Sequence, residues 1–511
     1  MEETHTSSAI HDPERAMPPD LTKDGPVTHQ LPTTIKDDDA SSSSTTKVLR
    51  KLTSWGVEVR GIAPVPEKDQ TKTQYHNIFF VWLSMLTNLL PIITGMVGTL
   101  SYGLSLRDAS LTILFFSLLC YIPTAYMNIL GPQTGMRQMV QARYSFGFFP
   151  VIIVVLLNMM TIVGFTVIAG IVAGQTLSAV SDGKISLALG IVITFIVGLF
   201  VSFCGYRVIH VYNRWSWLGV LVCFVIMTGC GGKHLSQQVQ AQPADASLIL
   251  NFGCLIAGFS IAFAGLMSDY SVYYRTDAPA ARMFWYAYLG QILPTILLMI
   301  LGAAIGGAVP NVPGWNEGHE RFSTGGVLEA MLRPAGGFGK FVAVLLAFSL
   351  IGNVSASMYS VNLNWQILVP WFARLPRIIF SIVTTAVMIP VAITAATDFF
   401  ESLENFLGIV SYWPSSFAAI VIIEHVLFRK SDSSTYDRSI WRDPRNLPCG
   451  AAAIVAGIAS FALVIPCMAA TWYTGPIAEH TGDIGFEVAF ALAGLLYVPL
   501  RTLEIRVQGR L

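Results

Sequence analysis

Polar side chains that can bind a small molecule occur inside long apolar stretches of this sequence. The stretch "SLIGNVSASMYSVNLN" places Asn353, Ser355, Ser357 and Asn362 in one segment. A single Asn or Ser in such a segment often serves only to link helices, but four exceed what packing requires. Because amides both donate and accept hydrogen bonds, this set suits a planar, uncharged heterocycle with an alternating hydrogen-bonding edge.

A second stretch, 148–173, carries Asn158 and Thr161 shortly before Phe165. Phe165 can stack on the face of a planar ring, as can Phe259 and Phe263 in a later stretch, although a lone Phe in an apolar helix is more often part of the core. The two stretches together therefore predict a binding site made of a few amides, hydroxyls and aromatic rings.

Acidic residues enter or border the apolar stretches at Asp269, Glu401, Glu404 and Glu424. A carboxylate held at apolar depth is costly and often belongs to a proton or ion pathway. The alternative is that Asp269 and Glu424 lie at an interface and pair with Arg or Lys. Both interpretations stay open from the residues alone.

The composition identifies the solvent in which these groups must work. Apolar residues make up 53% of the 511-residue chain and charged residues only 12%, about half the usual charged share of a soluble protein. The net charge is zero, so no overall field recruits nucleic acid. The seven cysteines show no disulfide or metal spacing. These features predict an integral membrane protein, and we expect no metal and no bound cofactor.

Apolar stretches of roughly 20 residues, long enough to cross a hydrocarbon core, recur along the chain. The polar segment 1–75 is expected to be a disordered cytosolic tail, 76–504 the membrane domain and 505–511 a short cytosolic tail. We count twelve stretches, at 77–101, 109–130, 148–173, 186–205, 213–231, 248–268, 284–309, 338–363, 376–397, 403–428, 449–472 and 485–504.

The loops between these stretches indicate the orientation, because short cytosolic loops are rich in Lys and Arg. Alternate loops carry pairs or clusters of basic residues, beginning with Arg137 and Arg143, and the opposite loops are poorer. The long loop 310–337, with Arg321 and Arg333, is the exception. An even number of spans with both termini in the cytosol fits this alternation.

Two spans in corresponding positions are predicted to be broken. The first contains "LTNLLPIITGMVG" and the sixth "CLIAGFSIAFAGLMSDY". Gly and Pro are common in membrane helices and help them pack. In matching places of two five-helix halves, however, such segments are typical of transporters with inverted repeats, whose substrate lies between two discontinuous helices.

The segment "GPQTGMRQMVQARYSFG" at 131–147 resembles the loop signature of fungal purine-cytosine permeases, the fungal branch of the nucleobase-cation symporters. Further blocks follow in the family's order, and the resemblance extends from about Trp55 to the end. They are "GQTLSAVS", "SFCGYRVIHVYNR", "GCGGKHL", "SDYSVYY", "LGAAIGGAVPNVPGW", "PAGGFGKF" and "SLENFLGIVSYW".

The resemblance implies an all-α membrane protein of about twelve transmembrane helices with a five-plus-five inverted repeat, a LeuT-like fold in which helices one and six are discontinuous. It also implies proton symport of cytosine, adenine, guanine and hypoxanthine across the plasma membrane, with the proton as coupling ion and sodium not excluded. Carried over by position, the substrate-binding residues are Ser84, Asn88, Asn158, Thr161, Phe165, Phe259, Ser260, Phe263, Asn353 and Ser357.

Among the acidic residues, Asp269 and Glu404 are the candidates for a proton relay. In the family that this chain resembles, the loop 131–147 joins spans two and three on the cytosolic side. From that position we expect Gly131, Pro132 and Gly135 to allow a tight turn and Arg137 and Arg143 to hold a gate.

This sequence departs from the family at two positions. Some relatives have a Trp in span six where this chain has only Phe259, Ser260 and Phe263, and some have a second Asn where it has Ser357. Alternatives therefore stay open: a symporter for another small heterocycle such as a B6 vitamin or allantoin, a substrate sensor, or a membrane enzyme. An enzyme is disfavoured because the nine histidines fall mostly in tails, loops and span ends. The oligomeric state is not predicted.

Overall fold

The computed structural model describes residues 61–203, 206–241, 243–369, 371–372, 375 and 377–511. Most of the predicted tail, residues 1–60, lies outside the described residues. The described residues form helices almost throughout, together with one short antiparallel pair of strands, β1 (Ala469–Ala470) and β2 (Tyr473–Thr474). Long apolar runs give helices because a helix satisfies its own backbone hydrogen bonds.

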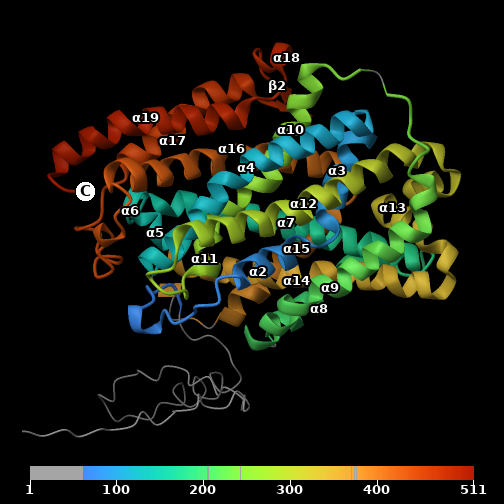
Figure 1. Ribbon diagram of the computed structural model, residues 1–511, viewed down its shortest axis with the longest axis horizontal. Helices are drawn as coiled ribbons and strands as arrows, with labels where there is room; N and C mark the ends of the chain where they lie inside the picture. The colour runs from blue at the N-terminus through green and yellow to red at the C-terminus, as the bar shows by residue number, and fades with distance from the viewer. Residues whose placement is uncertain (1–60, 204–205, 242, 370, 373–374, 376) are drawn as a thin grey trace, which may run out of the picture. The chain divides into compact units, whose positions relative to one another are not determined.

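The main helices run side by side and roughly along one direction (Figure 1). In chain order they are α2 (Asn77–Leu86), α3 (Leu89–Leu100), α4 (Leu106–Thr134), α7 (Val151–Val180), α8 (Leu187–Phe203), α9 (Tyr206–Gly231), α10 (Ala246–Ile261), α12 (Ala280–Ala308), α13 (Pro313–Leu332), α14 (Gly336–Leu368), α15 (Arg377–Ala395), α16 (Phe399–Ile423), α17 (Ala451–Cys467) and α19 (Gly485–Gln508).

Shorter elements connect or interrupt these helices. They are the α-helical turns α5 (Gln138–Gln141), α6 (Arg143–Phe146), α11 (Met267–Ser271) and α18 (Ala478–Thr481), the 3-10 turns η1 (Glu67–Asp69), η2 (Gly232–His234), η3 (Ala262–Gly265), η4 (Val309–Asn311), η5 (Arg333–Ala335) and η8 (Ser433–Thr435), and the π-helical turn η7 (Glu424–Phe428).

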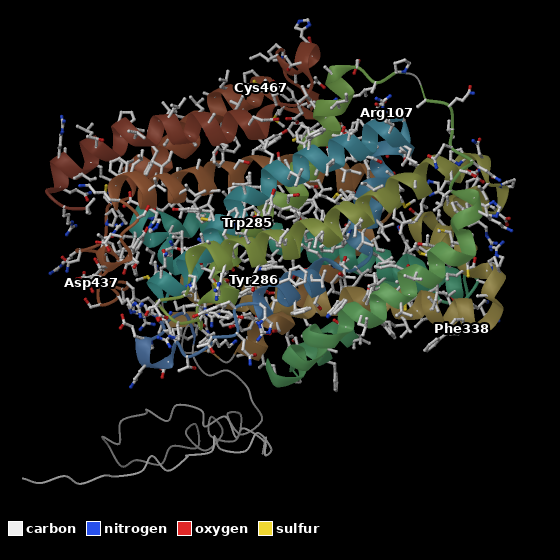
Figure 2. All side chains as sticks on the ribbon, in the orientation of Figure 1. Arg107, Trp285, Tyr286, Phe338, Asp437 and Cys467 are labelled. Atoms are coloured by element: carbon white, nitrogen blue, oxygen red, sulfur yellow. The ribbon has the colours of Figure 1, made fainter. Side chains whose placement is uncertain are left out.

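The helices have the length and composition of membrane spans. Nine helical segments among the described residues are long and apolar enough to cross a membrane, and the bent pair α2–α3 makes a tenth. Two further apolar helices, α8 and α17, are shorter. All twelve predicted stretches fall on these helices, so the all-α membrane fold is confirmed. Large apolar side chains stand on the outside of the bundle, among them Trp285 of α12 and Phe338 of α14 (Figure 2), as expected of a surface that faces lipid.

Both predicted breaks are present. In span one, α2 ends at Leu86 and α3 begins at Leu89 with a bend of 54°. In span six, α10 passes into the 3-10 turn η3, and the backbone leaves the helical conformation at Leu266 before α11 begins. The discontinuous helices one and six are therefore confirmed.

Glycines bring α3 against α12, the helix that follows span six. A Cβ atom on Gly95 would lie 1.9 Å from the carbonyl oxygen of Met299, and one on Gly302 would lie 1.9 Å from that of Ile92. The two backbones are thus in direct contact, as small residues allow in membrane helices. This contact fixes one half of the broken first span.

The segment 310–337 differs from its prediction as a long loop, because α13 occupies most of it. The helix is held against α7: the Thr324 hydroxyl donates to Gln175 Oε1 over 2.6 Å, and Gly325 lies against the Gln175 backbone. Its charged and Gly-rich sequence resembles a loop, and the helix is kinked at Phe322 and Ser323, where the backbone leaves the helical conformation.

The ordered domain begins earlier than the predicted boundary at residue 75. Ile62 and Val65 are buried, and the Gln70 amide donates to the carbonyl oxygens of Pro132, Val272 and Tyr274. At the other end, α19 continues to Gln508, so most of the predicted tail 505–511 is helical. Packing before residue 75 and continuation of the helix beyond residue 504 are features that hydropathy does not show.

Candidate functional site

A cavity lies where the breaks of the two discontinuous helices meet. The space not filled by protein atoms there is about 520 Å³, including the part that opens to solvent. The wall is apolar except for a few amides and hydroxyls. Its residues are Met85, Leu86, Asn88, Leu90, Thr161, Ile162, Phe165, Phe259, Ala262, Phe263, Leu266, Tyr270, Asn353 and Ser357.

Most of the residues predicted to bind substrate line this one cavity. They come from α7, α10 with η3, α14 and the break between α2 and α3. The seven are Asn88, Thr161, Phe165, Phe259, Phe263, Asn353 and Ser357.

Three other predicted residues lie outside the cavity wall. Ser84 faces α9, where its hydroxyl lies 2.9 Å from that of Ser216. Ser260 is fully buried in α10. Asn158 lies beside the break in span six, where its Nδ2 donates to the carbonyl oxygen of Gly265 over 3.2 Å. Whether a polar residue lines the cavity depends on the face of the helix on which it lies, and the sequence pattern does not determine which face meets the cavity.

Asparagine side chains stabilise both helix breaks. Asn88 is the N-cap of α3: its Oδ1 accepts from the backbone N–H of Leu90 over 2.8 Å, and its Nδ2 donates to the carbonyl oxygen of Met85 over 2.7 Å. Asn158 serves the carbonyl freed at Gly265 in the same way. Broken helices leave backbone groups without helical partners. Such amides bond to these groups and so stabilise the breaks at apolar depth.

Aromatic rings form one side of the cavity. Phe165 and Phe263 lie nearly parallel, with ring centroids 6.4 Å apart and planes 23° apart, and Phe259 meets Phe165 edge-on at 5.9 Å. Trp82, which lies behind the wall, packs edge-on against Phe263 and Tyr270. The Trp that some relatives have in span six is absent from the described residues that line this cavity, but the indole of Trp82 in span one packs against this side of the cavity.

The polar part of the wall comes from α14 and α7. Ser357 donates its hydroxyl hydrogen to Asn353 Oδ1 over 3.2 Å, and Asn353 Nδ2 lies 3.4 Å from the carbonyl oxygen of Met85. On α7, the Thr161 hydroxyl accepts a hydrogen bond from Trp413 Nε1 of α16 over 2.9 Å. Trp413 was not predicted, because a Trp in an apolar span is usually part of the core.

The predicted gate residues Arg137 and Asp269 meet at the end of the bundle that carries Asp437. Arg137 Nη1 donates to the backbone carbonyl oxygen of Asp269 over 3.0 Å, and its guanidinium lies over the rings of Tyr273 and Tyr359. Asp269 Oδ1 accepts from the backbone N–H of Gln138 over 2.9 Å. The loop 131–147 is therefore bound directly to the broken sixth span.

This loop differs from the predicted tight turn. Gly131 and Pro132 still belong to α4, whereas Gly135 adopts a left-handed conformation, with φ +67°. Gly131 serves another purpose, because a Cβ there would lie 2.1 Å from Ser271 Oγ of α11. The small residue lets the sixth span approach α4.

Arg143 is buried at the same end. Its Nη1 donates to the carbonyl oxygen of Trp441 over 2.8 Å, and its guanidinium lies 4.8 Å from the centre of the Phe148 ring. Burial, and then the nearby Arg442 guanidinium, lowers the pKa of Arg143 to about 10. Arg143 therefore remains a cation at neutral pH.

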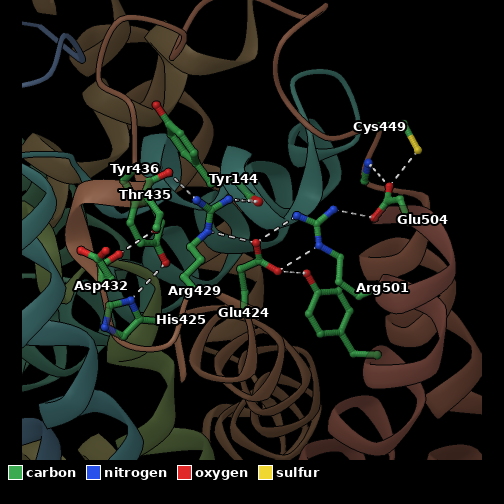
Figure 3. A network of polar contacts seen from close by, with 12 residues as sticks. Tyr144, Glu424, His425, Arg429, Asp432, Thr435, Tyr436, Cys449, Arg501 and Glu504 are labelled. Atoms are coloured by element: carbon green, nitrogen blue, oxygen red, sulfur yellow. Dashed lines mark hydrogen bonds and ion pairs between the residues drawn. The ribbon is translucent and has the colours of Figure 1, made fainter. Parts of the chain in front are cut away.

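Two of the other acidic candidates, Glu404 and Glu424, lie far apart along α16 and the turn that follows it. Glu404 is half-buried next to Ser101 of the loop after α3. Glu424 follows α16 twenty residues later, about 30 Å along the helix, and is fully buried between Arg429 and Arg501, each 3.0 Å away (Figure 3). Of the two interpretations left open by the sequence, Glu424 therefore agrees with pairing to arginine.

The comparisons with known proteins cover nearly the whole molecule. Residues 64–488 match the family model described as a permease for cytosine/purines, uracil, thiamine and allantoin. The purine-cytosine permease fcyB of Emericella nidulans is 34% identical, with 92% of this chain and 93% of that protein covered. The vitamin B6 transporter TPN1 of Saccharomyces cerevisiae is 28% identical, with 90% of each covered.

A solved structure has the same fold. Mhp1, a nucleobase-cation-symport-1 family transporter in a closed conformation with bromovinylhydantoin bound, aligns with a TM-score of 0.69 at 17% identity, covering 88% of this chain and 97% of that one. The extent of the family match and the identity to fcyB identify the kind of protein. The chain is a membrane transporter, not an enzyme, and it belongs to the family of permeases for cytosine/purines, uracil, thiamine and allantoin.

Proposed function

We propose that this chain is a proton-coupled symporter that imports cytosine and the purine bases adenine, guanine and hypoxanthine across the plasma membrane, with both termini in the cytosol. The observation that carries the proposal is the cavity between the two helix breaks, which is lined both by the polar residues Asn353, Ser357 and Thr161 and by the rings of Phe165 and Phe263. Amides and hydroxyls match the edge of a base, and rings match its faces.

The similarity to purine-cytosine permeases supports this substrate class. The second candidate is transport of a B6 vitamin, because TPN1 is related over most of its length. Both ligands are small planar heterocycles, so they differ in the arrangement of donors and acceptors at the ring edge. One edge partner can change discrimination by orders of magnitude.

Coupling requires that proton and base shift the same conformational equilibrium. Asp269 is the carboxylate that best meets this requirement, because it follows the break in span six and contacts the loop that carries Arg137. Glu404 lies toward the other end of the helices. We assign the cytosolic side to the end with Arg137, Arg143 and Arg429, since basic loops stay in the cytosol.

Uptake of labelled cytosine into yeast that lack their own nucleobase permeases tests the proposal. Unlabelled adenine, guanine and hypoxanthine should compete with it, whereas pyridoxine and allantoin should not. Asn353→Ala should abolish saturable uptake at an unchanged surface level, and Asn311→Ala, at an exposed site, should not. Uptake of labelled pyridoxine without any cytosine uptake would replace the proposal by the second candidate.

A further inference from the structure

The hydroxyl of Thr161 is held from two directions. It donates its hydrogen to the carbonyl oxygen of Leu157, one turn earlier in α7, over 2.9 Å. It also accepts the indole hydrogen of Trp413 over 2.9 Å. A hydroxyl has one hydrogen to donate and two lone pairs to accept with. In this arrangement one lone pair is left for a ligand in the cavity.

Trp413 is itself fixed in place. Its side chain is buried, 8% exposed, and its ring packs near Phe417. The preceding residue, Tyr412, donates to Asp483 Oδ2 over 2.5 Å, which attaches this turn of α16 to the segment before α19. Since an indole nitrogen can only donate, Trp413 can bond to the Thr161 hydroxyl only as a hydrogen-bond donor.

Ser357 on α14 shows the same polarity. Its hydrogen is donated to Asn353 Oδ1 over 3.2 Å, so its free lone pairs remain for a ligand. Two hydroxyls of the wall therefore present acceptors. Asn353 Nδ2 has one hydrogen directed toward Met85 and a second that is available to a ligand, because a carboxamide carries two.

Resting on the proposed function, we propose that Trp413 is a positioning residue that fixes Thr161 as a hydrogen-bond acceptor, so that the cavity selects heterocycles presenting N–H groups to Thr161 and Ser357. Trp413 does not line the cavity and acts through Thr161. The ligand class is a planar ring with at least two N–H donors and one acceptor. Rings methylated at these nitrogens are excluded by lost hydrogen bonds, not only by size.

Competition against labelled cytosine uptake tests this inference, with cytosine, 1-methylcytosine and N4,N4-dimethylcytosine as unlabelled competitors. Against the unsubstituted chain, at least one methylated compound should compete about tenfold less well than cytosine, the size expected for one hydrogen bond. In Thr161→Val that ratio should shrink severalfold. Val has the shape of Thr, so the steric cost of the methyl group cancels between the two proteins.

Trp413→Phe, which keeps an aromatic ring but removes the donor, should shrink the same ratio while Thr161→Ser preserves it. Thr166→Val is the matched control: its hydroxyl makes the same type of bond to Ile162, 2.7 Å long, but it does not line the cavity. If Trp413→Phe fails to reach the surface, Trp413→Leu, which also lacks a donor, takes its place. A ratio that is unchanged in both Thr161→Val and the Trp413 variant overturns the inference. If the unsubstituted chain still transports cytosine in that case, the inference has failed but the proposed function has not.

Discussion

Asn158 Nδ2 lies 3.2 Å from the carbonyl oxygen of Gly265, the last residue of the turn that interrupts span six. A Cβ on Gly265 would lie 2.2 Å from Asn158 Oδ1, so a larger residue there would displace the Asn158 amide. The amide thus supports the break without lining the cavity.

Asn158→Leu should therefore lower stability more than selectivity. Leaving the Gly265 carbonyl without this donor is expected to cost about 1–3 kcal/mol. We predict a lower melting temperature in detergent and reduced maximal uptake, with the competition order of the bases unchanged. Asn311→Leu, at an exposed site, should alter neither, and a changed competition order in Asn158→Leu would place this residue in direct contact with substrate.

Arg137→Gln should abolish uptake while the protein still reaches the surface. Arg137 is 2% exposed, and its guanidinium links the loop 131–147 to Asp269 and two tyrosine rings. Removing it takes a buried charge from this contact, and we expect at least a tenfold loss of uptake. Arg275→Gln, in an exposed pair with Asp277, is the control. Normal uptake by Arg137→Gln would remove the gating role.

Glu424→Gln should destabilise the chain strongly. Glu424 accepts from Arg429, Arg501 and the Tyr497 hydroxyl, and Arg501 also donates to Glu504 (Figure 3). Breaking a buried ion pair on one side costs about 3–5 kcal/mol, whereas Glu329→Gln, in a pair with the exposed Arg333, should cost at most about 1 kcal/mol. Thermal unfolding in detergent compares the two, and equal shifts would contradict this view of the network.

Phe165→Ala should weaken cytosine binding by removing one stacking face. Stacking of a base on an aromatic ring is worth about 1–3 kcal/mol, so the apparent KM for uptake should rise roughly 5- to 160-fold. Phe149→Ala, at a ring that is 65% exposed on the outside of the bundle, is the control. An unchanged KM in Phe165→Ala would mean that the substrate lies elsewhere.

The helices and the two breaks were predictable because hydropathy and the Gly and Pro clusters depend on local sequence. Seven cavity residues also followed, carried over from the family's positions. Trp413 and Tyr270 were missed, since aromatic residues in an apolar span have no local mark of function. Ser84, Asn158 and Ser260 were carried over in the same way but lie outside the cavity wall, because a family position does not show which neighbour a helix face meets. α13 was missed because Thr324 and Gly325 become informative only once α7 lies beside them.

Transport of cytosine by the purified chain in proteoliposomes is the most direct test of the central claim. With an inwardly directed proton gradient and no sodium, we predict accumulation of labelled cytosine above its external concentration, collapse of that accumulation with a protonophore, and loss of it in Asn353→Ala. Equilibration without accumulation under the proton gradient, or accumulation only under a sodium gradient, would contradict proton-coupled import.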